Sequence, residues 1–357
     1  MPGITFNNHR DTFKKSLIAD VIERPRPKRG FEGFFPRRTH DTAMLAINVL
    51  KYGRKVAVDV MRCTDPNMNT FSKSSENLYI PPQYFEGFDV CKCDGYYDTF
   101  GAVNGDFALG RLSALANSSF NKVSYLIDMI ERSIQIQHIQ VLTTGVVTLK
   151  NGDSIDYGRK SASMKVLAGA DKWDAQTSNI VKDIRTGCDF LRTEGQSTST
   201  EVSAIMGADA FENMIANEKF QKEFDLRRID RSYINAPQMD EATGFVFQGQ
   251  ISTGDFKVNL FTYNEVYEDA AGNTQRYLDK DTFILLPNDF TGETGFAANA
   301  GWVGEGINAR PVLIKDEFLI SDVLDIRKTV WEINVKSSPL AIPFHVDRIY
   351  TLKTAGN

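Results

Sequence analysis

Apolar and polar residues alternate on both sides of the Asn-Gly dipeptide at 151–152, within LTTGVVTLKNGDSIDYGR (residues 142–159). Asn-Gly tolerates the two positive φ angles of a type I′ turn, so a β-hairpin with a two-residue loop is expected here. The pair next to the turn would be of opposite charge, and Val146, Ile155 and Tyr157 would share one inward apolar face. The predicted facing pairs are Lys150 with Asp153, Thr148 with Ile155 and Val146 with Tyr157.

Directly before the hairpin, apolar residues recur at steps of three and four, which predicts an amphipathic helix over residues 119–141. About 20 residues at 1.5 Å per residue give a length of roughly 30 Å. Ser118 or Ser119 is expected to cap its N-terminus. The apolar stripe consists of Phe120, Val123, Ile127, Ile130 and Ile134.

Two more helices are predicted after the hairpin by the same periodicity. Asp174 is expected to cap the first of them, because an aspartate side chain can accept the free N–H groups of a first turn. Its apolar face would be formed by Ile180, Ile184, Cys188 and Leu191. The second helix would carry Phe211, Met214, Ile215, Phe220 and Phe224.

Residues 43–97 are predicted to form two long strands, which include KVAVDVMRC (55–63) and NLYIPPQYFEGFDVCKC (77–93). The polar stretch TDPNMNTFSKSSEN (64–77) lies between them and is expected to be a loop tip. Such a ribbon has too few apolar residues for a domain, and two strands alone in water are marginally stable. The ribbon is therefore expected to lie on a neighbouring surface.

From Phe245 onward the pattern is again typical of strands. FKVNLFTY (256–263) alternates, EDAAGNTQ (268–275) is a predicted loop tip, and DTFILLP (281–287) is a predicted buried strand. Two further strands are expected over residues 329–354. Because strands and helices are segregated and do not alternate as βαβ units, the predicted fold class is α+β.

The composition changes this picture little. The chain has 357 residues, of which 42% are hydrophobic and 24% charged, as in an ordinary soluble globular protein. It contains no apolar run long enough to span a membrane. Its first residues lack the apolar region of a signal peptide. A cytoplasmic product with four reduced cysteines is therefore expected.

The charge is unevenly distributed. A net charge of −5 argues against general nucleic-acid binding, yet ERPRPKRGFEGFFPRR (23–38) is strongly basic and rich in proline and glycine. This segment predicts an extended arm without a core of its own. Composition favours a solvated linker, and the alternative is an arm that meets an acidic neighbour or a phosphate backbone. The basic residues are Arg24, Arg26, Lys28, Arg29, Arg37 and Arg38.

Familiar catalytic and metal-binding patterns are absent from the sequence. Cys91 and Cys93 share a strand face, but no C-x-x-C pair occurs. GDFALGRL (105–112) has the glycine spacing of a phosphate loop, with Arg111 and Leu112 in place of its lysine and hydroxyl residue. GWVGEG (301–306) lacks the strand and helix of a dinucleotide site. No carboxylate pair stands out in segments such as MDEAT (239–243).

The histidines also lack the spacing of metal ligands. His138 is interpreted as a residue on the flank of the long helix. The four histidines are His9, His40, His138 and His345. Together these absences argue against catalysis, and neither a cofactor nor a metal is expected.

Several motifs, in this order, resemble those of one family. They are NGDSIDYGR (151–159) followed by the Trp-Asp pair at 173–174, NEKFQKEFDLRRIDRS (217–232), the segment from 254 to 287 that ends in DTFILLP, EGINARP (305–311) and SSPLAIPFHVDRIYTLK (337–353). The chain is similar over residues 40–354 to the lambda-type major head proteins, a family of tailed-phage major capsid proteins with the HK97-type fold. Because single motifs of this kind occur by chance, the resemblance rests on their common order.

The resemblance implies a division of the chain. Residues 1–42 would be an N-terminal arm, 43–97 an E-loop that lies over the adjacent subunit, and 98–173 the first part of a P-domain with a spine helix. Residues 174–325 would form an axial A-domain, and 326–357 would return to the P-domain. The implied subunit-interface candidates are Arg54, Arg62, Lys73, Tyr79, Tyr84 and Phe85.

The implied function is that of a major capsid protein, not an enzyme, which self-assembles into the icosahedral shell around packaged double-stranded DNA. The chain would be part of the virion and would assemble in the host cytoplasm. Its partners would be copies of itself in pentamers and hexamers, scaffold and portal proteins and the packaged DNA, with a decoration protein left open and no membrane. Lys73 lies in the loop where some relatives form a covalent cross-link, but no matching acceptor motif is present.

Other interpretations remain open at the level of the sequence. The HK97-type fold also forms encapsulin-like compartments that are not viral. A soluble α+β hydrolase or transferase with an unrecognised carboxylate site is a second alternative. A phage decoration or tail protein is a third, although such proteins are usually shorter and lack a spine helix.

Overall fold

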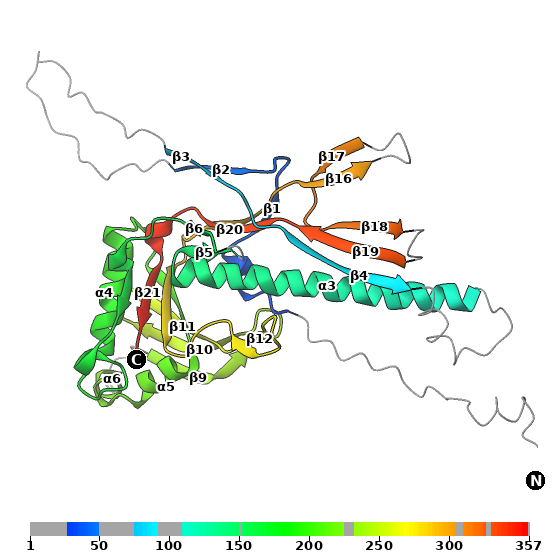
Figure 1. Ribbon diagram of the computed structural model, residues 1–357. Helices are drawn as coiled ribbons and strands as arrows, with labels where there is room; N and C mark the ends of the chain where they lie inside the picture. Colours follow the sequence, from blue (N-terminus) through cyan, green and yellow to red (C-terminus); the bar gives the residue numbers. More distant parts are fainter. Residues whose placement is uncertain are drawn as a thin grey trace, which may run out of the picture.

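The computed structural model describes residues 27–49, 75–91, 109–149, 152–224, 232–303, 310–325 and 330–355. Its centre is a seven-stranded mixed sheet in the order β7-β21-β14-β8-β11-β10-β9 (Figure 1). The strands are β7 (Met164–Val166), β8 (Glu201–Met206), β9 (Ser232–Met239), β10 (Phe245–Ser252), β11 (Lys257–Tyr263), β14 (Thr282–Pro287) and β21 (Tyr350–Lys353).

Both faces of this central sheet are covered. Helices α4 (Ile180–Thr193) and α5 (Ala208–Ala216) pack on one face, where Phe283 and Leu285 join the core. Ile284 and Leu286 point to the other face, into a second core beneath the end of the long helix α3. Because β14 has no face open to water, its apolar run is continuous, and the predicted buried strand DTFILLP is confirmed.

Helix α4 has the predicted apolar face, and its four named residues are buried. The predicted cap is wrong. Asn179, not Asp174, caps the helix, and its side-chain oxygen accepts a hydrogen bond from the Lys182 backbone N–H at 3.0 Å. Asp174 lies in a turn that comes five residues before the cap.

The single helix predicted over residues 211–224 is two helices, α5 and α6 (Glu218–Phe224). Asn217 separates them and is 1% exposed. Its side-chain oxygen accepts hydrogen bonds from the backbone N–H groups of Lys219 and Phe220, both at 3.0 Å, and its amide donates to the Ser178 hydroxyl. An asparagine that satisfies the first turn of a new helix ends the old one, which the apolar spacing alone does not reveal.

The long helix α3 (Leu109–Thr143) begins ten residues before the predicted start. Ser118 and Ser119 therefore lie inside the helix, and the predicted cap is wrong. The added segment LGRLSALANS is rich in leucine and alanine, which are strong helix formers. At 35 residues the helix is about 52 Å long. It lies against the long three-stranded sheet of the molecule (Figure 1).

This long sheet has the order β18-β19-β4 and contains β18 (Leu319–Asp325), β19 (Val330–Ser337) and β4 (Tyr84–Cys91). Val335 on β19 is fully buried and packs with Leu126, Ile130 and Ile134 of α3. The apolar stripe predicted for the helix is thus the surface that carries the long sheet.

The ribbon predicted over residues 43–97 is present at its base, where β2 (Leu45–Val49) pairs with β3 (Ser75–Tyr79). The strand expected at residues 55–63 and the tip before Ser75 lie outside the described residues. After β3 the chain leaves the ribbon at Pro81 and Pro82, which cannot donate to a ladder. Tyr84–Cys91 then pairs with β19, not with the ribbon.

The hairpin predicted around Asn-Gly 151–152 is formed by β5 (Val146–Thr148) and β6 (Ser154–Asp156), but in a different register from the predicted one. Val147 faces Ile155, and the Leu149 N–H donates to the Asp153 carbonyl at 2.9 Å, so three residues form the loop. Gly152 supplies one positive φ of +88°. The two-residue loop is therefore wrong. Val147, 1% exposed, points inward in place of Val146, while Ile155 is buried as expected.

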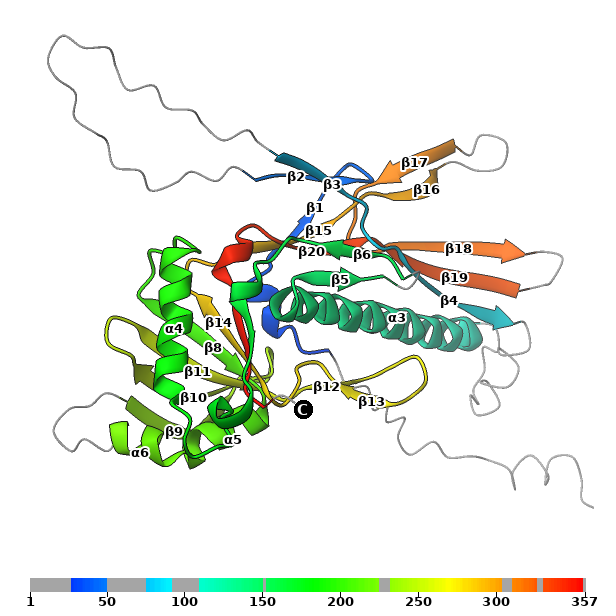
Figure 2. The same ribbon diagram turned by 60° about the vertical axis from the view of Figure 1, so that its left-hand side comes forward.

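The remaining strands form small sheets around these cores (Figure 2). The loop tip predicted at residues 268–275 lies between β12 and β13, which confirms it. The sheets are β1 (Arg37–Thr39) with β15 (Gly292–Phe296) and β20 (Pro339–Pro343), β12 (Val266–Glu268) with β13 (Thr274–Arg276), and β16 (Asn299–Val303) with β17 (Arg310–Ile314). The short 3-10 helices are η1 (Gly30–Gly33), η2 (Ser161–Ser163), η3 (Gly169–Asp171) and η5 (Val346–Arg348).

Strand pairing crosses the boundaries that the resemblance implies. β18 ends at residue 325, the expected end of the A-domain, yet it pairs along its whole length with β19. β21 lies in the central sheet beside β14, not with the long helix. The division into named domains stays a prediction, whereas the mixture of segregated helices and strands confirms the α+β class.

Candidate subunit interface

Three of the six interface candidates lie outside the described residues, namely Arg54, Arg62 and Lys73. The other three follow one another along β3 and the start of β4. Tyr79 ends β3, and Tyr84 and Phe85 begin β4.

Tyr79 and Tyr84 contact their own chain. The Tyr79 ring lies 5.4 Å from that of Tyr157, centroid to centroid, and so holds the ribbon base on the β5–β6 hairpin. The Tyr84 hydroxyl accepts a hydrogen bond from the Gln137 side-chain amide of α3 at 2.9 Å. Burial raises the pKa of Tyr84 above its ordinary value. Both tyrosines hold the surface in place on their own chain and are only partly exposed.

Phe85 is different, because 54% of its surface is exposed. It lies opposite Lys336 of β19, whose ammonium nitrogen is 4.6 Å from the ring centroid. Such a contact keeps a large aromatic ring in place on an open sheet face. Of the described candidates, Phe85 is the most exposed.

The base of the ribbon adds an apolar surface that none of the six candidates includes. Leu45 is 4% exposed and points into the core, while the residues on the opposite face point to solvent. We call this set the ribbon outer face. Its members Met44, Leu78 and Ile80 are 46%, 61% and 64% exposed, respectively. The alternation of residues 44–46 and 78–80 indicates that the ribbon has two different faces, but only the strand pairing shows which face is covered.

More exposed apolar residues lie on the neighbouring strands. Val312 and Leu313 of β17 are 37% and 51% exposed, and Ile320 and Val323 of β18 are 53% and 52% exposed. The β2–β3 and β16–β17 hairpins project from the side of the molecule opposite α5 and α6 (Figures 1 and 2). Several exposed apolar side chains on projecting hairpins are typical of a surface that contacts another protein.

The basic segment before β1 is not a solvated linker. Phe31 and Phe35 are fully buried in the core beside Tyr263 and His138. The alternative interpretation, an arm that meets an acidic neighbour, holds for residues 27–39. Residues 1–26, with Arg24 and Arg26, lie outside the described part of the chain.

The acidic neighbour is Glu131 of α3, which is 1% exposed. Arg37 binds it with both terminal nitrogens, at 2.9 and 2.5 Å, and also approaches Glu32 at 2.6 Å and Glu317 at 3.0 Å. Arg29 adds a third contact to Glu131 at 3.3 Å. The arm is thus locked to the long helix and to the loop before β18.

Side chains that could bind a metal do not cluster within the described residues. No group of three His, Cys, Asp or Glu side chains could hold a metal there. Cys188 is buried, and this burial raises the pKa of its thiol to about 12. Leu109–Leu112 of the phosphate-loop candidate lie in the first turn of α3. Within the described ranges, no helix is both long and apolar enough to cross a membrane.

His138 is not the flank residue that the sequence suggests. It is 1% exposed, its ring stacks on Phe35 at 4.7 Å, and its Nε2 lies 2.8 Å from the Thr294 hydroxyl. Burial and, secondarily, the charge of Arg37 lower the pKa of His138 to about 3. The imidazole is therefore neutral in the folded chain at all but strongly acidic pH.

Acidification is expected to destabilise the fold through His138. Between a pH of about 6.5 and about 3, the unfolded chain binds a proton here that the folded chain excludes. The free energy of unfolding should fall as the pH decreases, by up to about 1.4 kcal/mol per pH unit from this group. Urea unfolding between about pH 7 and pH 5 should show a smaller fall for His138→Gln. Equal slopes in the wild-type protein and in His138→Gln would contradict the prediction.

Taken together, these observations describe exposed apolar hairpins that project from a long helix and its sheet, a surface suited to contacts between proteins. Residues 16–354 match the family of phage major capsid protein E, and the chain belongs to that family. It is a phage capsid protein, and the resemblance seen in the sequence is confirmed. No curated protein matches the chain.

Solved structures of capsid proteins are similar to this chain. A prophage protein of E. coli CFT073, assigned as a capsid protein, has a TM-score of 0.59 at 17% identity, over 92% of this chain and 93% of its own. The cyanophage P-SCSP1u capsid has a TM-score of 0.48 at 12% identity, over 98% and 94%. The mature capsid of bacteriophage PhiM1 has a TM-score of 0.47 at 10% identity, over 94% and 90%. The family match and the first of these structures confirm the HK97-type fold.

Proposed function

We propose that this major capsid protein assembles with copies of itself, as pentamers and hexamers, into the icosahedral shell around packaged double-stranded DNA. The ribbon outer face carries the proposal, because Met44, Leu78 and Ile80 expose apolar area on an element that cannot bury it within its own chain. A neighbouring subunit that covers this face would stabilise both chains. Such a contact joins two different faces, so a ring of subunits closes on itself.

In this proposal residues 43–97 contain the E-loop, of which the ribbon at 43–79 reaches the neighbour. α3 with the long sheet forms the rigid body on which a neighbour's ribbon rests. Phe85 is the most exposed interface candidate among the described residues, and Tyr79 and Tyr84 remain candidates beside it. Arg54, Arg62 and Lys73 remain candidates on the ribbon. Residues 1–42 would be the arm, and the central sheet with α4 to α6 the axial domain.

The remaining parts of the proposal follow from family membership. The chain would have no catalytic activity, would need no cofactor, and would assemble in the host cytoplasm with scaffold and portal proteins. Contact with DNA would be non-specific, since a shell of net acidic chains does not hold its contents tightly. The same membership favours a phage head over an encapsulin-like compartment.

Assembly itself is the test. Purified protein, expressed with its scaffold, is expected to form closed shells or ring-shaped capsomers because the ribbon outer face is covered only in the assembly. Light scattering and negative-stain electron microscopy would measure the particle size. A monodisperse monomer at high concentration under every condition would contradict the proposal. Particles that lack nucleic acid and enclose a protein cargo would instead favour the compartment.

A further inference from the structure

Arg159, the last residue of the hairpin motif, lies buried at the C-terminal end of α3. It is 8% exposed. Its Nη1 donates hydrogen bonds to the carbonyls of Leu142 at 2.7 Å and Thr143 at 3.1 Å. A helix end leaves these carbonyls without partners, and a cation is favourable there. The guanidinium therefore caps the long helix from outside its own sequence.

The same guanidinium also binds the central sheet. Its Nη2 donates to the Ile349 carbonyl at 3.2 Å and to the Thr351 hydroxyl at 2.7 Å, beside and within β21. Its Nε donates to the Ser163 hydroxyl of η2 at 3.0 Å, and its Nη2 also reaches the Ser163 carbonyl at 3.1 Å. One side chain thus joins α3, η2 and β21, and none of these acceptors is charged.

The backbone around Arg159 makes this junction tight. Gly145 follows the end of α3 with a φ of +73°, and a Cβ added there would lie 2.8 Å from the Arg159 Cβ. The Thr351 hydroxyl donates in turn to the Leu142 carbonyl at 2.8 Å. Burial lowers the pKa of Arg159 to about 9, so the side chain still carries its charge at neutral pH.

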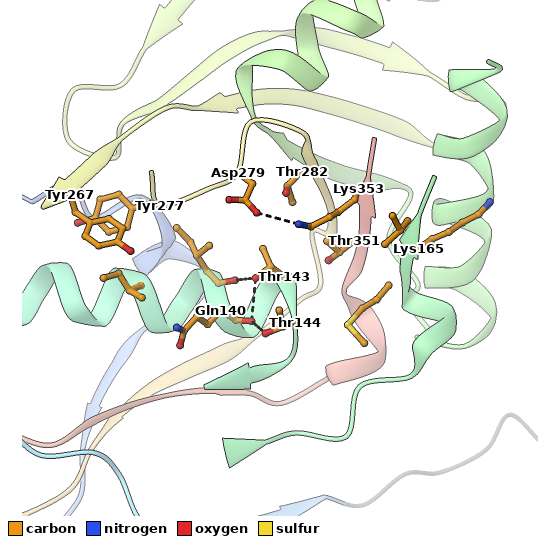
Figure 3. Close-up of a pocket in the computed structure, with 14 residues that line it drawn as sticks. Gln140, Thr143, Thr144, Lys165, Tyr267, Tyr277, Asp279, Thr282, Thr351 and Lys353 are labelled. Atoms are coloured by element: carbon orange, nitrogen blue, oxygen red, sulfur yellow. Dashed lines mark hydrogen bonds and ion pairs between the residues drawn. The ribbon is translucent and has the colours of Figure 1, made fainter. Parts of the chain in front are cut away.

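A cavity borders the same end of the helix. A cavity of about 290 Å³ lies between α3, the edge strand β7 and the segment after β13. Figure 3 shows Gln140 and Thr143 of the helix on one side of it and Lys165, Thr351 and Lys353 on the other. Thr143 and Thr351 thus border both the Arg159 junction and the cavity, so the side chains that fix the helix end have open space beside them.

We propose that Arg159 is the positioning residue that sets the angle between α3 and the central sheet, and thereby the curvature of the shell. This inference rests on the proposed function. Because α3 is about 52 Å long, a rotation of about 5° at this end moves the far end by about 4–5 Å. The long sheet, with Phe85 and Ile320, would move with it. An icosahedral shell of pentamers and hexamers places one chain at several angles, which the cavity would permit and Arg159 would limit.

Arg159→Lys tests the inference in the full chain assembled with its scaffold. Lysine keeps the charge but lacks the planar fork, so it cannot bind α3, η2 and β21 at once. The variant is expected to assemble into particles with a shifted mean diameter or a broader range of diameters, measured by electron microscopy. Thr351→Val, which removes one acceptor, should give a smaller change in the same direction.

Ile184→Val provides the control, because Ile184 is fully buried in the core between α4 and the central sheet. It should lower the melting temperature and leave the diameters unchanged. Wild-type diameters for both Arg159→Lys and Thr351→Val would overturn the inference. If Arg159→Lys fails to fold, the diameters of Thr351→Val alone decide between the two outcomes. Absence of shells from the wild-type protein is a separate result, which would overturn the proposed function.

Discussion

Arg37→Ala is expected to lower the free energy of unfolding by about 3–5 kcal/mol, because it leaves a buried carboxylate without its main partner. Glu131 is 1% exposed, and both of its oxygens bind Arg37. Arg29 contacts Glu131 at 3.3 Å but is half exposed and cannot replace the bidentate pair. Urea unfolding of the unassembled chain, followed by circular dichroism, would measure the loss.

Arg38→Ala is the matched control on the next residue of β1. Arg38 is 72% exposed and lies 3.7 Å from Glu293, so its loss should cost no more than about 1 kcal/mol. The double variant Arg37→Met, Glu131→Met should be less destabilised than Arg37→Ala, because it removes both charges together. An effect of Arg37→Ala no larger than that of Arg38→Ala would show that the pair does not hold the arm.

The basic arm shows how far composition leads. Proline, glycine and arginine between residues 23 and 38 predict an extended segment, and residues 27–39 have little regular structure before β1. The same composition could not show that Phe31 and Phe35 fill a core built from α3 and the central sheet. Long-range partners decide whether an arginine is solvated or paired, and Glu131 lies 94 residues from Arg37.

Periodicity located the elements and left their ends undetermined. The Asn-Gly dipeptide marks the hairpin, but a three-residue loop moves Val147 to the inward face that a two-residue loop gives to Val146. α3 starts early because leucine and alanine extend a helix without an apolar stripe. Capping depends on a single side chain at a single position, so Asn179 and Asn217 were missed although their spacing is visible.

The sequence predicted which region of the chain carries the candidate interface, but not which side chains of that region are exposed. The ribbon was predicted because this segment has strand-like patterns but too few apolar residues for a core. The pairing of β2 with β3 confirms its base. Which residues face outward depends on what covers the other face. Tyr79 packs on Tyr157, so Leu78 and Ile80 point to solvent. No pattern within the ribbon states that the β5–β6 hairpin lies beneath it.

Replacement of residues 50–74 by Asn-Gly is expected to abolish shell formation and leave the subunit folded. Val49 and Ser75 are paired across the ribbon, and a two-residue type I′ turn would close the hairpin at that pair. Ser75–Asn77 belong to β3, so the cut ends before them. The folded core should remain, because Leu45 and Tyr79 still hold the base on their own chain. Electron microscopy would show loss of shells, and circular dichroism an unchanged melting temperature.

A similar shortening of the β12–β13 hairpin is the control, because it shows whether removal of any exposed loop also prevents shell formation. Glu268 and Thr274 are paired there, and residues 269–273 can be replaced by Asn-Gly in the same way. This variant should still form shells, since its polar loop is not part of the ribbon outer face. Shells formed by the ribbon variant would show that the ribbon does not clamp one subunit to the next. Loss of shells in both variants would indicate that assembly does not depend on the ribbon in particular.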